Sequence, residues 1–388
     1  MRPEVRSILE RMSYWKKTIE AAKDFTGTSP PSVFVGRAFY PKVFVGILSP
    51  PQHQENAQQL DSPELWYKQN ASIQDILQTR GQLIYSRFKS DVNNFKGKLM
   101  ETTQEVAMTK KPVDVEVELM KSPTFRMRFD LHTSPIANPA PIAKARLTEN
   151  PSVEKRVDYL VSDVDIHAKN SVIALYNYRI PVSRIQKMLS AGLLGVQMQR
   201  KLVPTKWGVT AIDDIIGKHL REKMKDFQEL SEVMLFKNEY IGNHYQILLV
   251  PSSYEYELVE IWNLYGRAMI DSDYEPYWGK KEYAEKTAGA FYSGRLGVLE
   301  YLNKIRRQAG IIIIREVRSD YFAPVGIWQM REAVRDAFNK PCERFNSVEE
   351  AVKVISSRIL SKDEWINKSK ILKNRKTQSK LTKFYGLR

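Results

Sequence analysis

Residues 231–250 read SEVMLFKNEYIGNHYQILLV, and this stretch decides the fold class. Two apolar segments flank Gly242-Asn243, a pair typical of tight turns, so the stretch predicts an antiparallel hairpin. The apolar run GIIIIREV at 310–317 predicts a further, buried strand. Helical patterns at 210–225 and 280–308 stand before and after the hairpin. Because helices and strands follow one another without regular alternation, the sequence predicts an α+β fold with antiparallel hairpins.

The N-terminal half carries a second hairpin pattern. Apolar residues alternate over 113–119 and again over 125–131, and KSPT between them is a plausible turn. A connection with four prolines follows from Thr133 to Pro151, and we place a domain boundary there. The predicted regions are therefore 1–150, with the 113–131 hairpin, then 151–360, and a flexible basic tail at 361–388. The first two regions are expected to be closely packed subdomains.

Charge and cysteine content limit the function classes. The net charge is +15 and the pI is about 9.5, which points to a polyanionic partner, nucleic acid first. The single cysteine, Cys342, excludes an intrachain disulfide and argues against structural zinc on thiolates. The N-terminus lacks a signal-peptide pattern and no apolar run approaches the ~20 residues of a membrane span. We expect a cytoplasmic protein with no membrane segment.

Five long stretches carry a family resemblance. They are SPPSVFVGRAFYPKVFVG (29–46), LDSPELWY (60–67), LSAGLLG (189–195), QRKLVPTKWGVTAIDD (199–214) and GAFYSGRLGVLEYLNKIRRQA (289–309). Together they resemble the archaeal Nre family of DNA repair proteins. The resemblance implies a role in DNA damage tolerance and a C-terminal motif for the sliding clamp. Some members are thought to carry an N-terminal zinc-binding element, and this chain lacks the cysteines for one.

The last twelve residues, TQSKLTKFYGLR, fit a motif that binds the sliding clamp, PCNA. A segment that folds one 3₁₀-like turn on the clamp brings positions i, i+3 and i+4 to one face. Leu381, Phe384 and Tyr385 would then form an apolar plug, and Gln378 would fit a polar pocket beside it. The alternative is that the two aromatic side chains dock on their own domain.

Residues 200–214 carry the strongest internal candidate for chemistry. Arg200, Lys201 and Lys206 are predicted to contact phosphates, next to a helix expected to begin at Thr210. The acids of its first turn, Asp213 and Asp214, are candidates to hold a divalent metal, Mg²⁺ or Mn²⁺, or to orient a water. The alternative is that Asp213 completes a capping box and both acids favour the helix dipole.

A second basic group lies in 289–309. Arg295 stands near Phe291 and Tyr292, and Arg306 and Arg307 follow, a mixture of aromatic and basic residues that suits a nucleic-acid groove. The alternative places the aromatic rings in the core and the arginines in solvent. The acidic stretch Asp271, Asp273 and Glu275 is interpreted as a solvated polar loop.

These observations predict a DNA repair factor that is recruited to the sliding clamp and engages DNA or a nucleotide product through basic residues. An alternative is a metal-dependent phosphodiesterase or nuclease that uses Asp213 and Asp214 or the acidic stretch at Asp271. A third possibility is an adaptor whose only binding element is its tail. The oligomeric state is left open.

Overall fold

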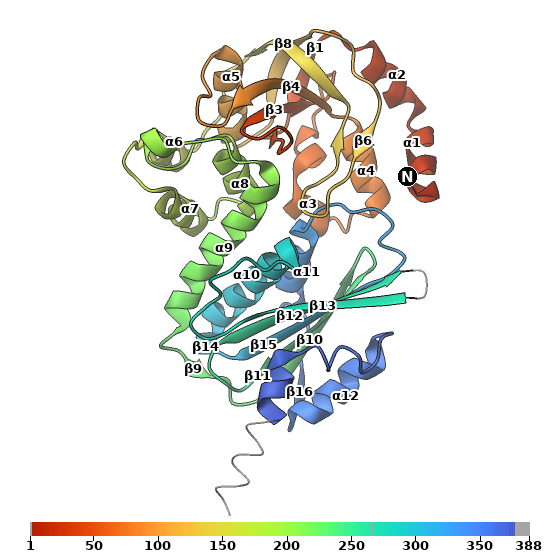
Figure 1. The fold of residues 1–388 in the computed structure, drawn as a ribbon. Helices are drawn as coiled ribbons and strands as arrows, with labels where there is room; N and C mark the ends of the chain where they lie inside the picture. Colours follow the sequence, from red (N-terminus) through yellow and green to blue (C-terminus); the bar gives the residue numbers. More distant parts are fainter. Residues whose placement is uncertain (1, 265–266, 377–388) are drawn as a thin grey trace, which may run out of the picture. The chain divides into compact units, whose positions relative to one another are not determined.

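The computed structural model describes residues 2–264 and 267–376, and it contains two compact units (Figure 1). Within the described residues, unit 1 covers 2–216 and 322–326, and unit 2 covers the remainder. Each unit combines one mixed six-stranded sheet with helices, so the α+β prediction is confirmed. The division falls inside helix α9 (Thr205–Met224), not in the proline-rich connection near residue 150.

The sheet of unit 1 has the strand order β1-β5-β8-β4-β3-β2. β8 and β4 are parallel, and the other neighbours are antiparallel. The strands are β1 (Asp24–Ser29), β2 (Val33–Val35), β3 (Lys42–Ser49), β4 (Ile84–Asp91), β5 (Val113–Leu119) and β8 (Pro139–Leu147).

Helices cover both faces of this sheet. On one face, α5 (Lys98–Met108) packs Met100 against Val43 and Val45. On the other face, the 3₁₀ helix η1 (Ala57–Asp61) packs Leu60 against Leu48 and Tyr85. The remaining helices of unit 1 are α1 (Pro3–Arg11), α2 (Ser13–Ala21), α3 (Pro63–Lys68), α4 (Ile73–Gly81), α6 (Lys155–Ser162), α7 (Ala168–Asn177), α8 (Val182–Ser190) and η2 (Gln197–Gln199).

The predicted hairpin at 113–131 is wrong. β5 is a strand with the expected alternating burial, but its partners are β1 and β8. In the second segment only Met127–Arg128 (β6) is a strand, and it pairs with β7 (Ile136–Ala137). Alternation identifies a half-buried strand but does not identify its partner. The proline-rich connection from Thr133 to Pro151 is not a loop, because it contains β7 and all of β8.

The sheet of unit 2 has the order β13-β12-β15-β11-β10-β16, with only β12 and β15 parallel. Its strands are β10 (Val233–Tyr240), β11 (Asn243–Val250), β12 (Glu255–Leu264), β13 (Arg267–Glu275), β15 (Gly310–Val317) and β16 (Glu343–Phe345), and β9 (Gln228–Glu229) pairs separately with β14 (Arg307–Gln308). The hairpin predicted at 231–250 is confirmed as β10–β11. Its turn is Ile241-Gly242, one residue earlier than predicted, because Asn243 already pairs with Tyr240.

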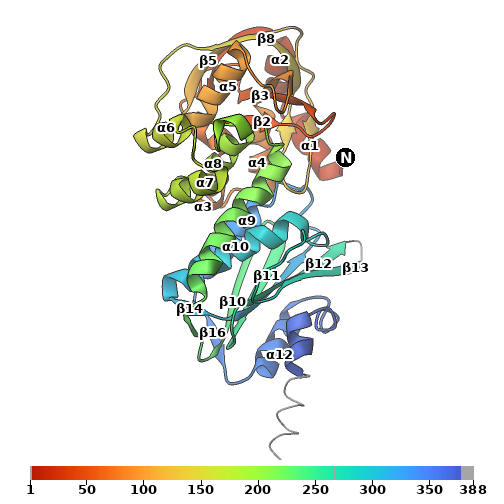
Figure 2. The same cartoon turned by 60° about the vertical axis from the view of Figure 1, so that its left-hand side comes forward.

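Helices also cover both faces of the unit 2 sheet. α10 (Ala288–Ile305) and α11 (Trp328–Ala337) lie on one face, where Phe291 contacts Tyr256. α12 (Val348–Arg358) lies on the opposite face (Figure 2), where Ile355 joins the cluster that includes Val259 and Ile314. Because side chains alternate across a strand, one run of apolar residues such as 310–314 fills both interfaces.

The first part of the predicted flexible tail is folded. Trp365 is fully buried, Ile371 and Leu372 join the α12 cluster, and residues 370–376 are helical. The prediction was wrong for 361–376 because it followed the high charge of this segment. The apolar residues within it are spaced to reach the sheet.

Candidate nucleic-acid interface

A pocket of about 220 Å³ opens in unit 1, and residues of β2, β3 and β4 line part of it. We call it the basic pocket, since its described lining contains four cationic side chains and one carboxylate. The cations are Arg37, Arg87, Arg128 and Lys206, the carboxylate is Asp130, and the aromatic lining is Phe34, Phe44, Tyr85 and Phe129.

Arg87 is the central cation of the basic pocket. Its guanidinium carbon lies 4.0 Å from the centre of the Phe44 ring and 5.8 Å from that of Tyr85. It makes no hydrogen bond or ion pair with any described residue. Burial, together with the charges of Arg128 and Arg126, lowers the pKa of this guanidinium. The fold therefore holds a half-buried cation that has no counter-charge among the described residues.

The aromatic walls are locked by their own contacts. Phe34 and Tyr85 meet edge to face, with ring centres 5.3 Å apart and planes at 88°. The Tyr85 hydroxyl donates to the carbonyls of Phe34 and Phe44, at 3.2 and 3.0 Å. Because this hydroxyl is occupied within the wall, Tyr85 presents carbon rather than oxygen to the pocket.

Lys206 reaches the same pocket from the first turn of α9. Its Nζ lies 3.0 Å from Oδ2 of Asp130. Burial opposes ionisation of Asp130, but hydrogen bonds from His132 and Lys206 outweigh it and lower the pKa of this carboxyl below its usual range. The pocket therefore offers an ionised hydrogen-bond acceptor as well as cations at neutral pH.

Exposed aromatic side chains rise at the rim. Phe39 is 72% exposed, although its φ of 66° lies in the left-handed region that a bulky residue rarely adopts. Tyr40 is also exposed and lies 5.2 Å, ring to ring, from Trp207. Lys89 stands over both Phe39 and Phe44, at 5.7 and 5.6 Å. Aromatic rings with interleaved cations are the usual surface for unpaired nucleic-acid bases.

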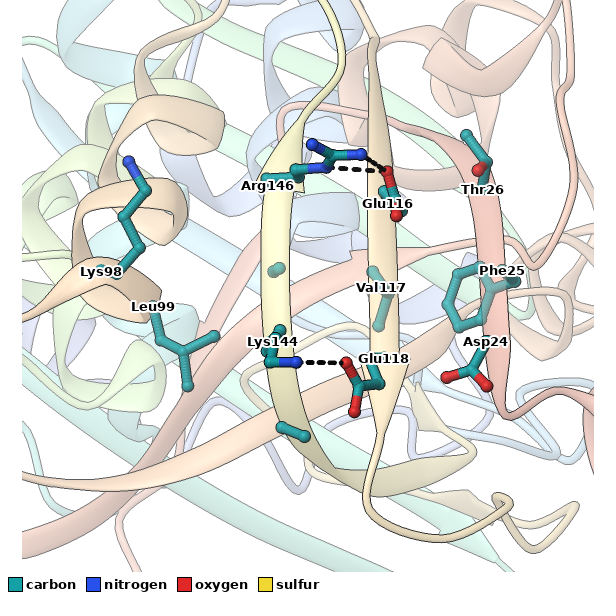
Figure 3. Close-up of a pocket in the computed structure, with 12 residues that line it drawn as sticks. Asp24, Phe25, Thr26, Lys98, Leu99, Glu116, Val117, Glu118, Lys144 and Arg146 are labelled. Atoms are coloured by element: carbon teal, nitrogen blue, oxygen red, sulfur yellow. Dashed lines mark hydrogen bonds and ion pairs between the residues drawn. The ribbon is translucent and has the colours of Figure 1, made fainter.

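A second depression of unit 1 is different in character (Figure 3). It lies over β1, β5 and β8, and four of its six charged side chains form two ion pairs. Glu116 accepts from Arg146 and Glu118 from Lys144, as the dashed lines in Figure 3 mark. Because these cations are already paired on an exposed face, this surface offers far less free charge than the basic pocket.

Of the cations predicted near residue 200, the structure brings only Lys206 into the basic pocket. Arg200 donates to the carbonyls of Gly195, Val161 and Asp163, each at 2.8 Å, and so ties a loop together. Lys201 is exposed and is not part of the described pocket lining.

The predicted helix start at Thr210 is wrong. α9 begins at Thr205, after Pro204, so Thr210 lies inside the helix and cannot cap it. Asp213 and Asp214 are thereby removed from the helix N-terminus, and Asp213 is fully buried. No group of three potential metal ligands gathers within the described residues.

The basic group of unit 2 is dispersed. Arg295 is buried and its Nη1 lies 2.6 Å from Oε2 of Glu275, so it belongs to the core rather than to a groove. Arg306 ends α10 with a left-handed φ of 53°, and Arg307 donates to the Gln228 side chain at 3.0 Å.

The acidic stretch was also misread. Residues 267–275 form strand β13 rather than a solvated loop. Asp273 accepts from the backbone N–H and the hydroxyl of Thr287, at 2.8 and 3.0 Å. Glu275 binds Arg221 as well as Arg295. These acids therefore hold unit 2 together.

The clamp-motif residues Gln378, Leu381, Phe384 and Tyr385 lie outside the described residues. None of the described helices combines the length and the apolar character needed to cross a bilayer.

Most of the basic pocket was missed from the sequence. One segment of the sequence, RAFYPK at 37–42, could have indicated it, because aromatic and basic residues interleave there as they do at 289–309. Arg87 and Arg128 could not have been added, because they stand 45–50 and 86–91 residues after this loop in the chain and reach the pocket on different strands, β4 and β6.

Relatives cover nearly the whole chain. It is 38% identical over 364 residues to a protein of Haloferax volcanii named DNA repair protein NreA, with 87% of this chain and 86% of the relative covered. It is 35% identical to DNA repair proteins NreB and NreA of Archaeoglobus fulgidus, which cover 95% and 98% of this chain and are themselves 94% covered. No solved structure matches the chain.

Two family descriptions divide the sequence between them. Residues 3–266 match "Archaeal Nre, N-terminal" and residues 275–384 match "Archaeal Nre, C-terminal". The chain belongs to the archaeal Nre family.

Proposed function

We propose that this protein is a DNA repair factor that binds nucleic acid at the basic pocket of unit 1. The repair role is supported by relatives named DNA repair proteins at 35–38% identity over most of the chain. The observation that carries the binding site is Arg87, a half-buried cation stacked on Phe44 and left without a carboxylate among the described residues. Of the cations that the sequence predicts to contact phosphates, this site contains Lys206, and it adds Arg37, Arg87 and Arg128.

A polyanion that binds at this surface would gain phosphate contacts, counterion release and stacking surfaces. Arg37 and Arg128 are exposed cations without a described carboxylate partner, so phosphates would replace water and not an existing ion pair. Neutralised phosphates release condensed counterions, which favours binding at low salt. Phe39, Phe44 and Trp207 add surfaces on which bases stack.

Recruitment to the sliding clamp is the second part of the proposal. Gln378, Leu381, Phe384 and Tyr385 fit the clamp motif in sequence. In the chain these residues follow the helical segment 370–376, and Leu372 of that segment is buried in unit 2. The motif would thus be attached to a fixed point of a folded unit.

Binding is tested by fluorescence anisotropy of labelled single-stranded and duplex DNA across a salt series. Arg128→Ala is expected to weaken binding and to reduce the salt slope by roughly 0.7–0.9. Arg146→Ala is the matched control, because it removes the same charge from an exposed, ion-paired site of unit 1. Equal losses in the two variants, or none in either, would count against the basic pocket.

Recruitment is tested by isothermal titration of an archaeal sliding clamp. A chain truncated after Arg375 is expected to lose clamp binding and to keep its affinity for DNA. Phe384→Ala with Tyr385→Ala in the full-length chain should reproduce this loss. Unchanged clamp affinity in both would refute recruitment through the tail.

A further inference from the structure

The size of the basic pocket selects among nucleic-acid groups. Its volume of about 220 Å³ equals that of roughly seven molecules of liquid water, at ~30 Å³ each. Pockets that hold whole drug-sized ligands begin at about 300 Å³. One planar base fits this scale, whereas a base pair with its backbones does not.

The lining matches the chemistry of a base. Phe34, Phe44 and Tyr85 form apolar aromatic walls, and the guanidinium of Arg87 is a planar cation stacked on one of them. Bases stack on both kinds of surface. Asp130 supplies an acceptor that a base's exocyclic amine can use.

The rim of the basic pocket suits the groups next to a base in a nucleic-acid strand, which are phosphates and a neighbouring base. Arg37 and Arg128 line the pocket and are exposed, which places cations where phosphates would pass. The Phe39 carbonyl accepts a hydrogen bond from Lys42 N–H at 2.9 Å, and the loop that carries Phe39 is closed by a bond from Gly36 N–H to the Phe44 carbonyl at 2.7 Å. An apolar ring held out in solvent this way is suited to stack between bases.

We propose that the basic pocket receives a single unpaired nucleobase, with Arg87 and Phe44 as its stacking wall and Phe39 against the neighbouring base. This inference rests on the proposed function and specifies its ligand. The base can come from a single strand, from a duplex in which it is extruded, or from a free nucleotide. Extrusion costs a few kcal/mol from a matched pair and less from a mismatched one. Affinity should therefore rank single strand and mismatch above matched duplex.

The test uses full-length protein and oligonucleotides that carry one 2-aminopurine, in a single strand, opposite an abasic site, or in a matched duplex. Anisotropy of a distant label reports binding, and 2-aminopurine emission reports the environment of the base. We expect the first two probes to bind at least about tenfold more tightly than the matched duplex. Their emission should change on binding.

Arg87→Lys and Phe44→Leu separate stacking from charge. Lysine keeps the positive charge but lacks the planar stacking surface. Both variants are expected to lose the tenfold preference and the emission change, while binding to matched duplex persists. Arg146→Lys is the matched control and should behave as the parent. Thermal unfolding midpoints confirm that each variant is folded.

The outcomes distinguish the two proposals. If no probe binds, the proposed function fails together with this inference. If all probes bind equally and emission does not change, nucleic-acid binding stands and the base pocket is refuted. With preference and emission change present, competition by a nucleoside monophosphate identifies the free nucleotide as a further source. Lack of competition restricts the source to polynucleotides.

Discussion

The guanidinium carbon of Arg87 lies 4.0 Å above the centre of the Phe44 ring, and no described carboxylate pairs with it. Burial lowers the pKa of Arg87, which means that the folded chain disfavours its charged form relative to water. At neutral pH the group is nevertheless a cation, so holding it there opposes folding. Sites that reduce stability in this way are commonly functional.

Arg87→Met should therefore separate stability from binding. Methionine keeps an unbranched side chain against Phe44 and removes the charge. We expect a thermal midpoint no lower than that of the parent, and an affinity for single-stranded DNA reduced about tenfold or more. Arg146→Met, at an exposed ion pair with Glu116, is the control for charge loss. A midpoint several degrees lower in Arg87→Met would show that the cation supports the fold instead.

Variants of Phe39 also separate stability from binding, because the backbone of this residue is strained while its side chain is exposed. In the left-handed region glycine avoids a cost of about 1–2 kcal/mol that other residues bear. Phe39→Gly should therefore be more stable than Phe39→Ala by about 1 kcal/mol in urea unfolding. Both should weaken single-strand binding. Tyr159→Ala, 69% exposed on α6, is the control. Equal stability of the two Phe39 variants would mean that the loop relaxes.

Asp61 is expected to contribute to the acid stability of unit 1. It binds Arg80 Nη1 and Lys187 Nζ, both at 2.8 Å, in a buried site. Burial opposes its ionisation, but the two cations outweigh burial and lower the pKa of Asp61 to about 2. A carboxyl with a lowered pKa stabilises the fold above its ordinary value of 3.8, and this contribution is lost as the pH falls from there to about 2.

Asp61→Asn should therefore cost about 3–5 kcal/mol at pH 7, because it leaves Arg80 buried without its counter-charge. The difference in unfolding free energy from the parent should shrink by about 2 kcal/mol between pH 4 and pH 2. Urea unfolding across this pH range measures it, with exposed Asp24→Asn as the control. A difference that does not vary with pH would contradict the assignment.

Local patterns predicted elements better than they predicted partners. Ser72 followed by Asp75 predicts a helix N-cap from sequence, and the capping box is present at α4, since all its atoms lie within four residues. The sequence after it predicts a helix to about Phe88, yet α4 ends at Gly81, and residues 84–91 form strand β4. Residues 84–91 form a strand because they pair with β3 and β8, and the local sequence pattern does not show this long-range pairing.

The same limit explains the candidate site. Lys206 was predicted as a phosphate contact and does line the basic pocket, but Arg295 was predicted on equal grounds and is buried against Glu275. Sequence shows that aromatic and basic residues interleave in both segments. Whether an arginine faces solvent or a buried carboxylate depends on strand β13, a segment whose sequence predicts a polar loop.

Gly242 lies in the turn of the β10–β11 hairpin, and its substitution tests the conformation of that turn. Its φ is 74°, and a Cβ there would lie 2.4 Å from the backbone nitrogen of Tyr321. Gly242→Ala should combine conformational strain with a clash against backbone and cost at least about 2 kcal/mol in urea unfolding. Gly97→Ala is the matched control, because its φ is 108° but no atom lies within 4 Å of the added Cβ. The difference between the two variants isolates the clash, and equal costs would exclude it.

Glu257 anchors the segment that leads to the predicted clamp motif. Its carboxylate accepts from the hydroxyl of Ser369 at 2.6 Å and from the N–H groups of Lys370 and Ile371 at 2.7 and 3.2 Å. Burial raises the pKa of Glu257 despite these bonds. A raised carboxyl pKa means that stability falls as the pH rises from the ordinary value of 4.5 through the folded value.

Two variants at this position should therefore act in different ways. Glu257→Gln keeps one acceptor and removes the charge, so it should abolish this fall in stability with pH. Glu257→Ala leaves the donors of 369–371 without their acceptor, at about 1–3 kcal/mol, and should speed amide hydrogen exchange in 369–376. Glu239→Ala, at an exposed residue of unit 2, is the control. If exchange in Glu257→Ala stays as slow as in the parent, burial of Ile371 and Leu372 holds the segment, and the carboxylate is not its anchor.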